Sequence, residues 1–75
     1  MNEMSTKILE ETLNKTVLVR LRGGRSLRGK LMGFDQHLNL VLNDTDDITE
    51  SENVKKLGIL IVRGDNVVII SPPPR

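Results

Sequence analysis

Cysteine is absent from the chain of 75 residues, and histidine and aromatic residues are almost absent, with His37 and Phe34 the single examples. The lack of cysteine excludes disulfides and thiolate metal sites, and one histidine excludes a multi-histidine metal site within one chain. We therefore predict no metal and no other cofactor. A domain of this size buries only about 60% of its unfolded surface, so association with other copies is the stabilising device that remains.

Long apolar runs are also missing. No segment approaches the roughly 18 apolar residues of a membrane span, and residues 1–15 contain no apolar stretch of signal-peptide length. We expect a soluble protein without a membrane partner, and the lack of cysteine favours a reducing, cytoplasmic location.

Charge is nearly balanced, at a net +1, but it is unevenly distributed. Residues 15–30 carry basic and no acidic side chains, whereas residues 43–53 carry acidic and no basic ones. Both segments can be read as solvated surface. We adopt that interpretation for the acidic segment and leave it open for the basic one.

Hydropathy patterning predicts one helix followed by five strands. Helical spacing of apolar residues indicates a helix over 5–14, capped by Ser5 or Thr6. Period-two patterning indicates strands over 16–22, 25–34, 38–44, 56–62 and 66–71, with a glycine turn at 23–24 and a polar connection over 44–55. Gly29 and Gly33 share one face of the second strand, which favours a strongly bent sheet over a flat one. Phe34, the lone aromatic residue, is assigned to the core.

The last two predicted strands are apolar on both faces, unlike the first two. A strand buried on both sides needs cover on both sides, and a single 75-residue barrel has only one interior. We predict an obligate oligomer joined along these strands, which would also hide an aggregation-prone edge.

Two segments resemble one family. "LRGGRSLRGKLMGFDQHLNLVL" is similar to the first motif of the Sm and Sm-like RNA-binding proteins, with Gly29, Asp35, Asn39 and Leu42 at the family's spacing. "ILIVRGDNVVII" is similar to the second motif, an Arg-Gly after an apolar strand. The resemblance covers about residues 8–71 and is greatest to the archaeal members.

The resemblance implies a mainly β fold, with a short helix and a bent five-stranded antiparallel barrel. One domain would span residues 1–75, with the first motif over about 17–43, an acidic loop over 43–55, the second motif over about 57–71 and a proline-rich tail over 72–75. It also implies that the fourth strand of one subunit pairs with the fifth of the next to close a ring, usually of seven identical copies. The loops at 35–39 and 63–66 would line the pore and bind single-stranded, uridine-rich RNA.

Elementary chemistry agrees with that assignment. His37 and Arg63 are planar groups that can stack on a base, and Asn39 offers both a donor and an acceptor to its edge. We assign Asp35, Gly64 and Asp65 to support of the two loops. Taken singly, His37 is more often a turn residue and Asn39 a turn or strand-edge amide, and Arg63 beside Asp65 is a surface ion pair of little energy.

The remaining predictions are less specific to the motifs. Arg28 and Lys30 are candidate phosphate contacts, or else partners of a neighbour's acidic loop. We expect no enzyme, because no nucleophile–base pair is apparent. Instead we predict a role in RNA processing or ribonucleoprotein assembly, with other RNA-processing proteins as further partners. The alternative is a scaffold whose main partners are proteins.

Overall fold

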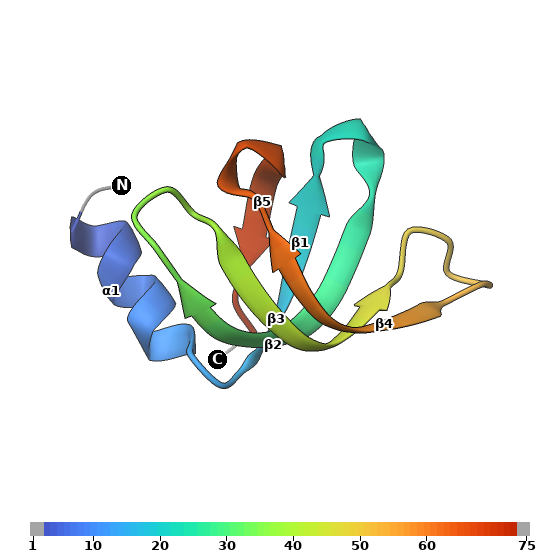
Figure 1. The fold of residues 1–75 in the computed structure, drawn as a ribbon, viewed down its shortest axis with the longest axis horizontal. Coiled ribbons are helices and arrows are strands. Elements are labelled where there is room, and N and C mark those ends of the chain that lie inside the picture. The colour runs from blue at the N-terminus through green and yellow to red at the C-terminus, as the bar shows by residue number, and fades with distance from the viewer. Residues whose placement is uncertain (1–2, 74–75) are drawn as a thin grey trace.

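A computed structural model describes residues 3–73 and shows one α-helix followed by a single five-stranded sheet, with short 3₁₀ turns at Arg22–Gly24 and Gly64–Asn66 (Figure 1). Every strand pair is antiparallel, and the strand order is β4-β3-β2-β1-β5. The predicted fold, a short helix and then a strongly bent antiparallel sheet, is confirmed. The elements are α1 Glu3–Thr12, β1 Thr16–Leu21, β2 Ser26–Phe34, β3 Leu40–Asp47, β4 Lys55–Val62 and β5 Val67–Ser71.

Helix α1 begins earlier than predicted. Ser5 and Thr6 lie inside it rather than capping it, so that assignment is wrong. Glu3 occupies the first turn, where a carboxylate complements the positive end of the helix dipole. The helix ends at Thr12, and Asn14 follows in a left-handed conformation (φ 68°), donating its N–H to the Leu31 carbonyl at 2.8 Å. The end of α1 is thereby fixed to β2.

The core forms from alternate residues of the first three strands, as the period-two pattern predicts. Val17 and Val19 of β1 are buried, whereas Leu18 between them is 47% exposed. Phe34 is half-buried and packs against this core, in agreement with its assignment. The buried apolar residues are Leu9, Val17, Val19, Leu27, Leu31, Leu40, Leu42 and Val62.

The bend of the sheet passes through Gly29. A Cβ atom at this position would lie 3.0 Å from Thr45 Oγ1 and 3.2 Å from Leu42 Cβ, so any side chain here would force its neighbours on β3 to shift. The register between the two strands shifts across Gly29, between Arg28 and Lys30, and again just before Gly33. The glycines therefore mark the bends, although a Cβ at Gly33 would meet nothing within 4 Å.

Strand β3 is longer at its C-terminal end than predicted. The prediction ends this strand at residue 44 and places 45–47 in the polar connection, but these residues continue the strand to Asp47. Asp46 lies opposite Arg28 of β2 and Lys56 of β4, and opposite charges directly across a sheet stabilise the pairing. The connection to β4 is correspondingly short.

Strands β4 and β5 are the two edges of the sheet, so the sheet bends without closing. Both edges expose apolar side chains: Ile59 and Ile61 of β4 are 72% and 71% exposed, and Val68 and Ile69 of β5 are 58% and 53% exposed. The apolar residues predicted on both faces of these two strands are therefore seen as exposed apolar side chains at both edges of the sheet. The predicted tail over 72–75 follows β5, and its last two residues lie outside the described range.

Candidate nucleic-acid interface

Two loops distant in sequence meet at the Asn39 side chain. The loop at 35–39 connects β2 to β3, and the turn at 63–66 connects β4 to β5. The Asn39 amide nitrogen donates to Asp35 Oδ2 at 2.9 Å, and its amide oxygen accepts the Gly64 N–H at 2.7 Å. We call this arrangement of Asp35, Asn39 and Gly64 the amide bridge. It joins the two loops that the sequence motifs single out.

The other Asp35 oxygen organises the first loop. Oδ1 accepts the backbone N–H of His37 at 2.9 Å and that of Asn39 at 3.1 Å. The bond from the Asn39 side chain to Oδ2 and, to a smaller extent, these two backbone bonds to Oδ1 hold the pKa of Asp35 below its ordinary value. The carboxylate therefore stays ionised, and it can only accept hydrogen bonds from Asn39.

Close contact between the loops requires glycine at position 64. A Cβ atom at Gly64 would overlap the His37 carbonyl oxygen and would lie 3.0 Å from the Leu38 carbonyl carbon. No side chain fits between these two backbones, so the glycine of the second motif is explained by close approach.

The planar side chains remain exposed around the bridge. His37 contributes its backbone N–H to the loop, which leaves its exposed ring available. The Arg63 side chain is 78% exposed, and its guanidinium lies 3.7 Å from the Asp65 carboxylate, which is also exposed. An ion pair this open is a weak restraint, so Arg63 can reorient toward a base or a phosphate.

Arg28 and Lys30 lie elsewhere, in the middle of β2. Arg28 donates to Asp46 Oδ2 at 3.0 Å, so its charge is paired within its own chain. Lys30 lies opposite Thr16 and Asn43. Neither residue belongs to the two loops that the amide bridge connects.

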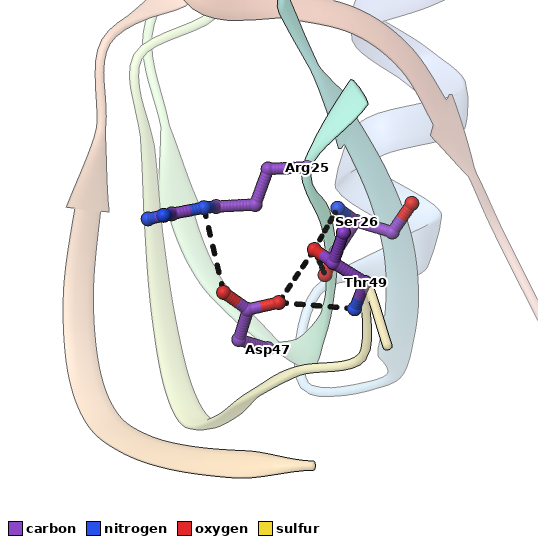
Figure 2. Close-up of polar contacts among 4 residues, drawn as sticks. All are labelled: Arg25, Ser26, Asp47 and Thr49. Atoms are coloured by element: carbon purple, nitrogen blue, oxygen red, sulfur yellow. Dashed lines mark hydrogen bonds and ion pairs between the residues drawn. The ribbon is translucent and has the colours of Figure 1, made fainter. Parts of the chain in front are cut away.

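A second polar network joins the turn after β1 to the loop after β3 (Figure 2). Asp47 accepts both the hydroxyl and the N–H of Thr49, at 2.6 and 3.0 Å, and it pairs with Arg25 at 3.4 Å. The Thr49 hydroxyl accepts the Ser26 N–H at 2.9 Å. We call these four residues the distal clamp. The hydrogen bonds from Thr49 lower the pKa of Asp47, and Arg25 adds to the effect.

The acidic segment is therefore not simple solvated surface. Asp46 and Asp47 are half-buried and paired with arginines of the basic segment.

Within residues 3–73 no group of histidine and carboxylate side chains is placed to hold a metal ion. The same residues contain no helix long and apolar enough to cross a membrane.

Sequence and structure comparisons agree on one family. The LSM domain model matches residues 7–72. A protein of Methanococcoides burtonii, named as an snRNP Sm-like protein, is 49% identical over 65 residues, covering 87% of this chain and 90% of the relative.

Two solved structures extend the similarity to three dimensions. The SmAP1 heptamer of P. aerophilum has a TM-score of 0.91 at 43% identity and covers 100% of both chains. The Sm protein of Pyrococcus abyssii, solved in complex with a uridine heptamer, has a TM-score of 0.84 at 42% identity, covering 97% of this chain and 100% of that one.

One residue of this region was not predicted from the sequence. Leu38 was assigned to the start of a strand over 38–44, but β3 begins at Leu40. Leu38 instead adopts a left-handed conformation (φ 61°) between His37 and Asn39. The only sign in the sequence that Leu38 belongs to the site is its position between two candidate site residues.

Proposed function

The chain belongs to the LSM domain family, and from this premise we propose that it forms a ring that binds single-stranded, uridine-rich RNA. The base would lie between His37 and Arg63, with Asn39 at its edge. The role is binding rather than catalysis, in RNA processing or ribonucleoprotein assembly. Similarity to the uridine-bound Sm protein of Pyrococcus abyssii supports the ligand, and the amide bridge is the observation in this chain that carries the proposal.

The amide bridge supports base selectivity because it fixes which way the Asn39 amide points. Rotating the amide by 180° would place its oxygen against the Asp35 carboxylate and its N–H groups against the Gly64 N–H. An amide has two donors and two acceptor lone pairs, and the bridge uses one of each. One donor and one acceptor remain, in a fixed order.

That order matches uracil. Uracil presents an N3–H donor beside the O4 acceptor, whereas cytosine and adenine present an acceptor ring nitrogen beside an amino donor. The fixed amide therefore complements uracil and opposes cytosine and adenine. Guanine presents its donor and acceptor in the same order as uracil. The site would therefore exclude guanine by the size of its larger ring system rather than by its hydrogen-bonding edge.

The exposed sheet edges support the ring. Strands β4 and β5 each present unpaired backbone groups and apolar side chains, and one copy's β4 can pair with the next copy's β5. The heptamer of P. aerophilum, which matches this chain over its whole length, supports seven copies. Stacking contributes about 1–3 kcal/mol per base, and repetition around a ring raises the effective concentration of each further site.

Binding of fluorescent oligo(U), oligo(C) and oligo(A) of equal length tests the proposal. We expect oligo(U) to bind at least tenfold more tightly than the other two, and Asn39→Ala to abolish that binding without changing the mass of the oligomer. Equal affinity for the three oligonucleotides would refute the assignment of Asn39 to the base edge.

A further inference from the structure

We infer that Leu38 is a positioning residue for the proposed base site. Its left-handed backbone, anchored by its own side chain next to α1, sets the directions of His37 and Asn39. The RNA-binding consequence rests on the proposed function, whereas the effect on the loop can be measured without RNA.

The conformation of Leu38 is unusual for its residue type. Within residues 3–73, three residues other than glycine have positive φ: Asn14, Leu38 and Asp44. Asparagine and aspartate tolerate this region, because their short polar side chains can bond to nearby backbone. Leucine has no such compensation, so its surroundings must hold it there.

The Leu38 side chain provides that restraint. It is half-buried and packs against the core. It also lines an apolar groove of about 380 Å³ between α1 and β5, together with Ile8, Leu9, Val67 and Ile70. A leucine with negative φ would direct this side chain differently and give up the contacts.

The backbone around Leu38 is restrained as well. Its N–H donates to the Asp35 carbonyl at 3.1 Å, and Gly64 packs directly on the His37–Leu38 peptide. These contacts meet at one residue, so Leu38 links the apolar groove to the loop that holds the amide bridge.

The left-handed turn has a direct consequence for the site. The chain reverses at Leu38, and the N–H groups of both neighbours converge on Asp35 Oδ1. The same reversal places the Asn39 amide between Asp35 and Gly64. If Leu38 returned to negative φ, Asn39 would leave the bridge and His37 would change direction.

Leu38→Ala tests the inference, because it removes the anchor and keeps a Cβ that disfavours positive φ. Leu38→Met preserves apolar packing and should behave as the wild type. Leu13→Ala is the matched control, because Leu13 also packs half-buried against the core but lies outside both loops. For each variant we would record the melting temperature, the oligomer mass, the oligo(U) affinity and the NMR signals of the Asn39 side-chain amide and the Gly64 N–H.

We expect Leu38→Ala to weaken oligo(U) binding about tenfold or more and to shift both bridge signals. Leu13→Ala should lower the melting temperature while leaving affinity within about twofold and both signals in place. Equal losses of affinity in the two alanine variants, or unchanged bridge signals in Leu38→Ala, would overturn the inference. If the wild type ignores oligo(U), the proposed function fails, and the NMR signals still decide whether Leu38 positions the loop.

Discussion

The amide bridge and the distal clamp are both networks of hydrogen bonds around an aspartate, but they leave different groups free. Each joins two segments distant in sequence, and each contains an aspartate that accepts several hydrogen bonds and has a lowered pKa. In the distal clamp, Asp47 is bonded by Thr49 and paired with Arg25, so both of its carboxylate oxygens have partners within the chain (Figure 2). In the amide bridge, Asn39 retains a donor and an acceptor, and His37 and Arg63 remain exposed beside it.

The difference separates a structural network from a candidate binding site. A network whose members satisfy one another fixes loops and offers little to a ligand. A network that fixes its loops and leaves groups free in a set orientation is preorganised for binding. On this reasoning the same substitution should have different consequences at the two places.

Gly64→Ala should have the largest effect on the bridge. The new methyl group would overlap the His37 carbonyl, so the two loops must separate and the bond from Gly64 to Asn39 is lost. We expect a loss of about 3 kcal/mol or more in the free energy of unfolding, measured by denaturant titration, and no detectable oligo(U) binding. Gly33→Ala is the control, because a Cβ there meets nothing within 4 Å. A Gly64→Ala protein that binds oligo(U) normally would contradict the close packing of the loops.

Asp35→Asn should alter selectivity more than overall stability. An amide at position 35 can donate as well as accept, so it no longer forces the Asn39 amide into one orientation. We expect the preference for oligo(U) over oligo(C), measured by fluorescence anisotropy, to fall about tenfold.

Asp47→Asn makes the same chemical change in the distal clamp and is the matched control. We expect it to leave both affinity and selectivity unchanged. If the two variants altered selectivity equally, the contrast between the two networks would be wrong.

Acidic pH should weaken both networks together. A carboxyl group whose pKa is lowered on folding contributes stability that is fully present above its unfolded pKa and is lost as the pH falls through the folded value. For Asp35 and Asp47 the loss should begin below about pH 4, since their ordinary pKa is 3.8. We would measure the midpoint of unfolding from pH 7 to pH 2. Below pH 4 this midpoint should fall less in Asp47→Asn than in the wild type. Identical profiles would show that Asp47 is not stabilised by its partners.

Arg28→Gln should have the smallest effect. Its ion pair with Asp46 is half exposed, and such pairs contribute about 0–1 kcal/mol. Because the guanidinium is already paired, we expect the slope of log affinity for oligo(U) against log salt to be unchanged. A clearly shallower slope would restore Arg28 as a phosphate contact.

Much of the fold could be predicted because the patterns that specify it are local. Alternation in β1 and β2 and the glycine turn determine the first hairpin. The end of β3 was missed because Asp46 and Asp47 read as loop residues in isolation. They stay in the sheet because Arg28 and Lys56 lie across from them, and such pairings are not visible along the chain.

The candidate site was predicted as a set of residues but not as a network. The motifs place Asp35, Asn39 and Gly64 in two loops, and only the structure shows one amide bonded to both. The conformation of Leu38 was unpredictable, because nothing local favours positive φ for leucine. It depends on packing against the core and on contact with Gly64.

Native mass spectrometry with oligo(U) and oligo(C) tests the central claim most directly, because it reports assembly and selectivity in one spectrum. The account predicts a single closed oligomer of about seven copies, as in the heptamer of P. aerophilum, which gains the mass of oligo(U) and not that of oligo(C). A stable monomer would contradict the pairing of β4 with β5 between copies. An oligomer that binds both oligonucleotides equally would contradict the reading of the base edge by Asn39.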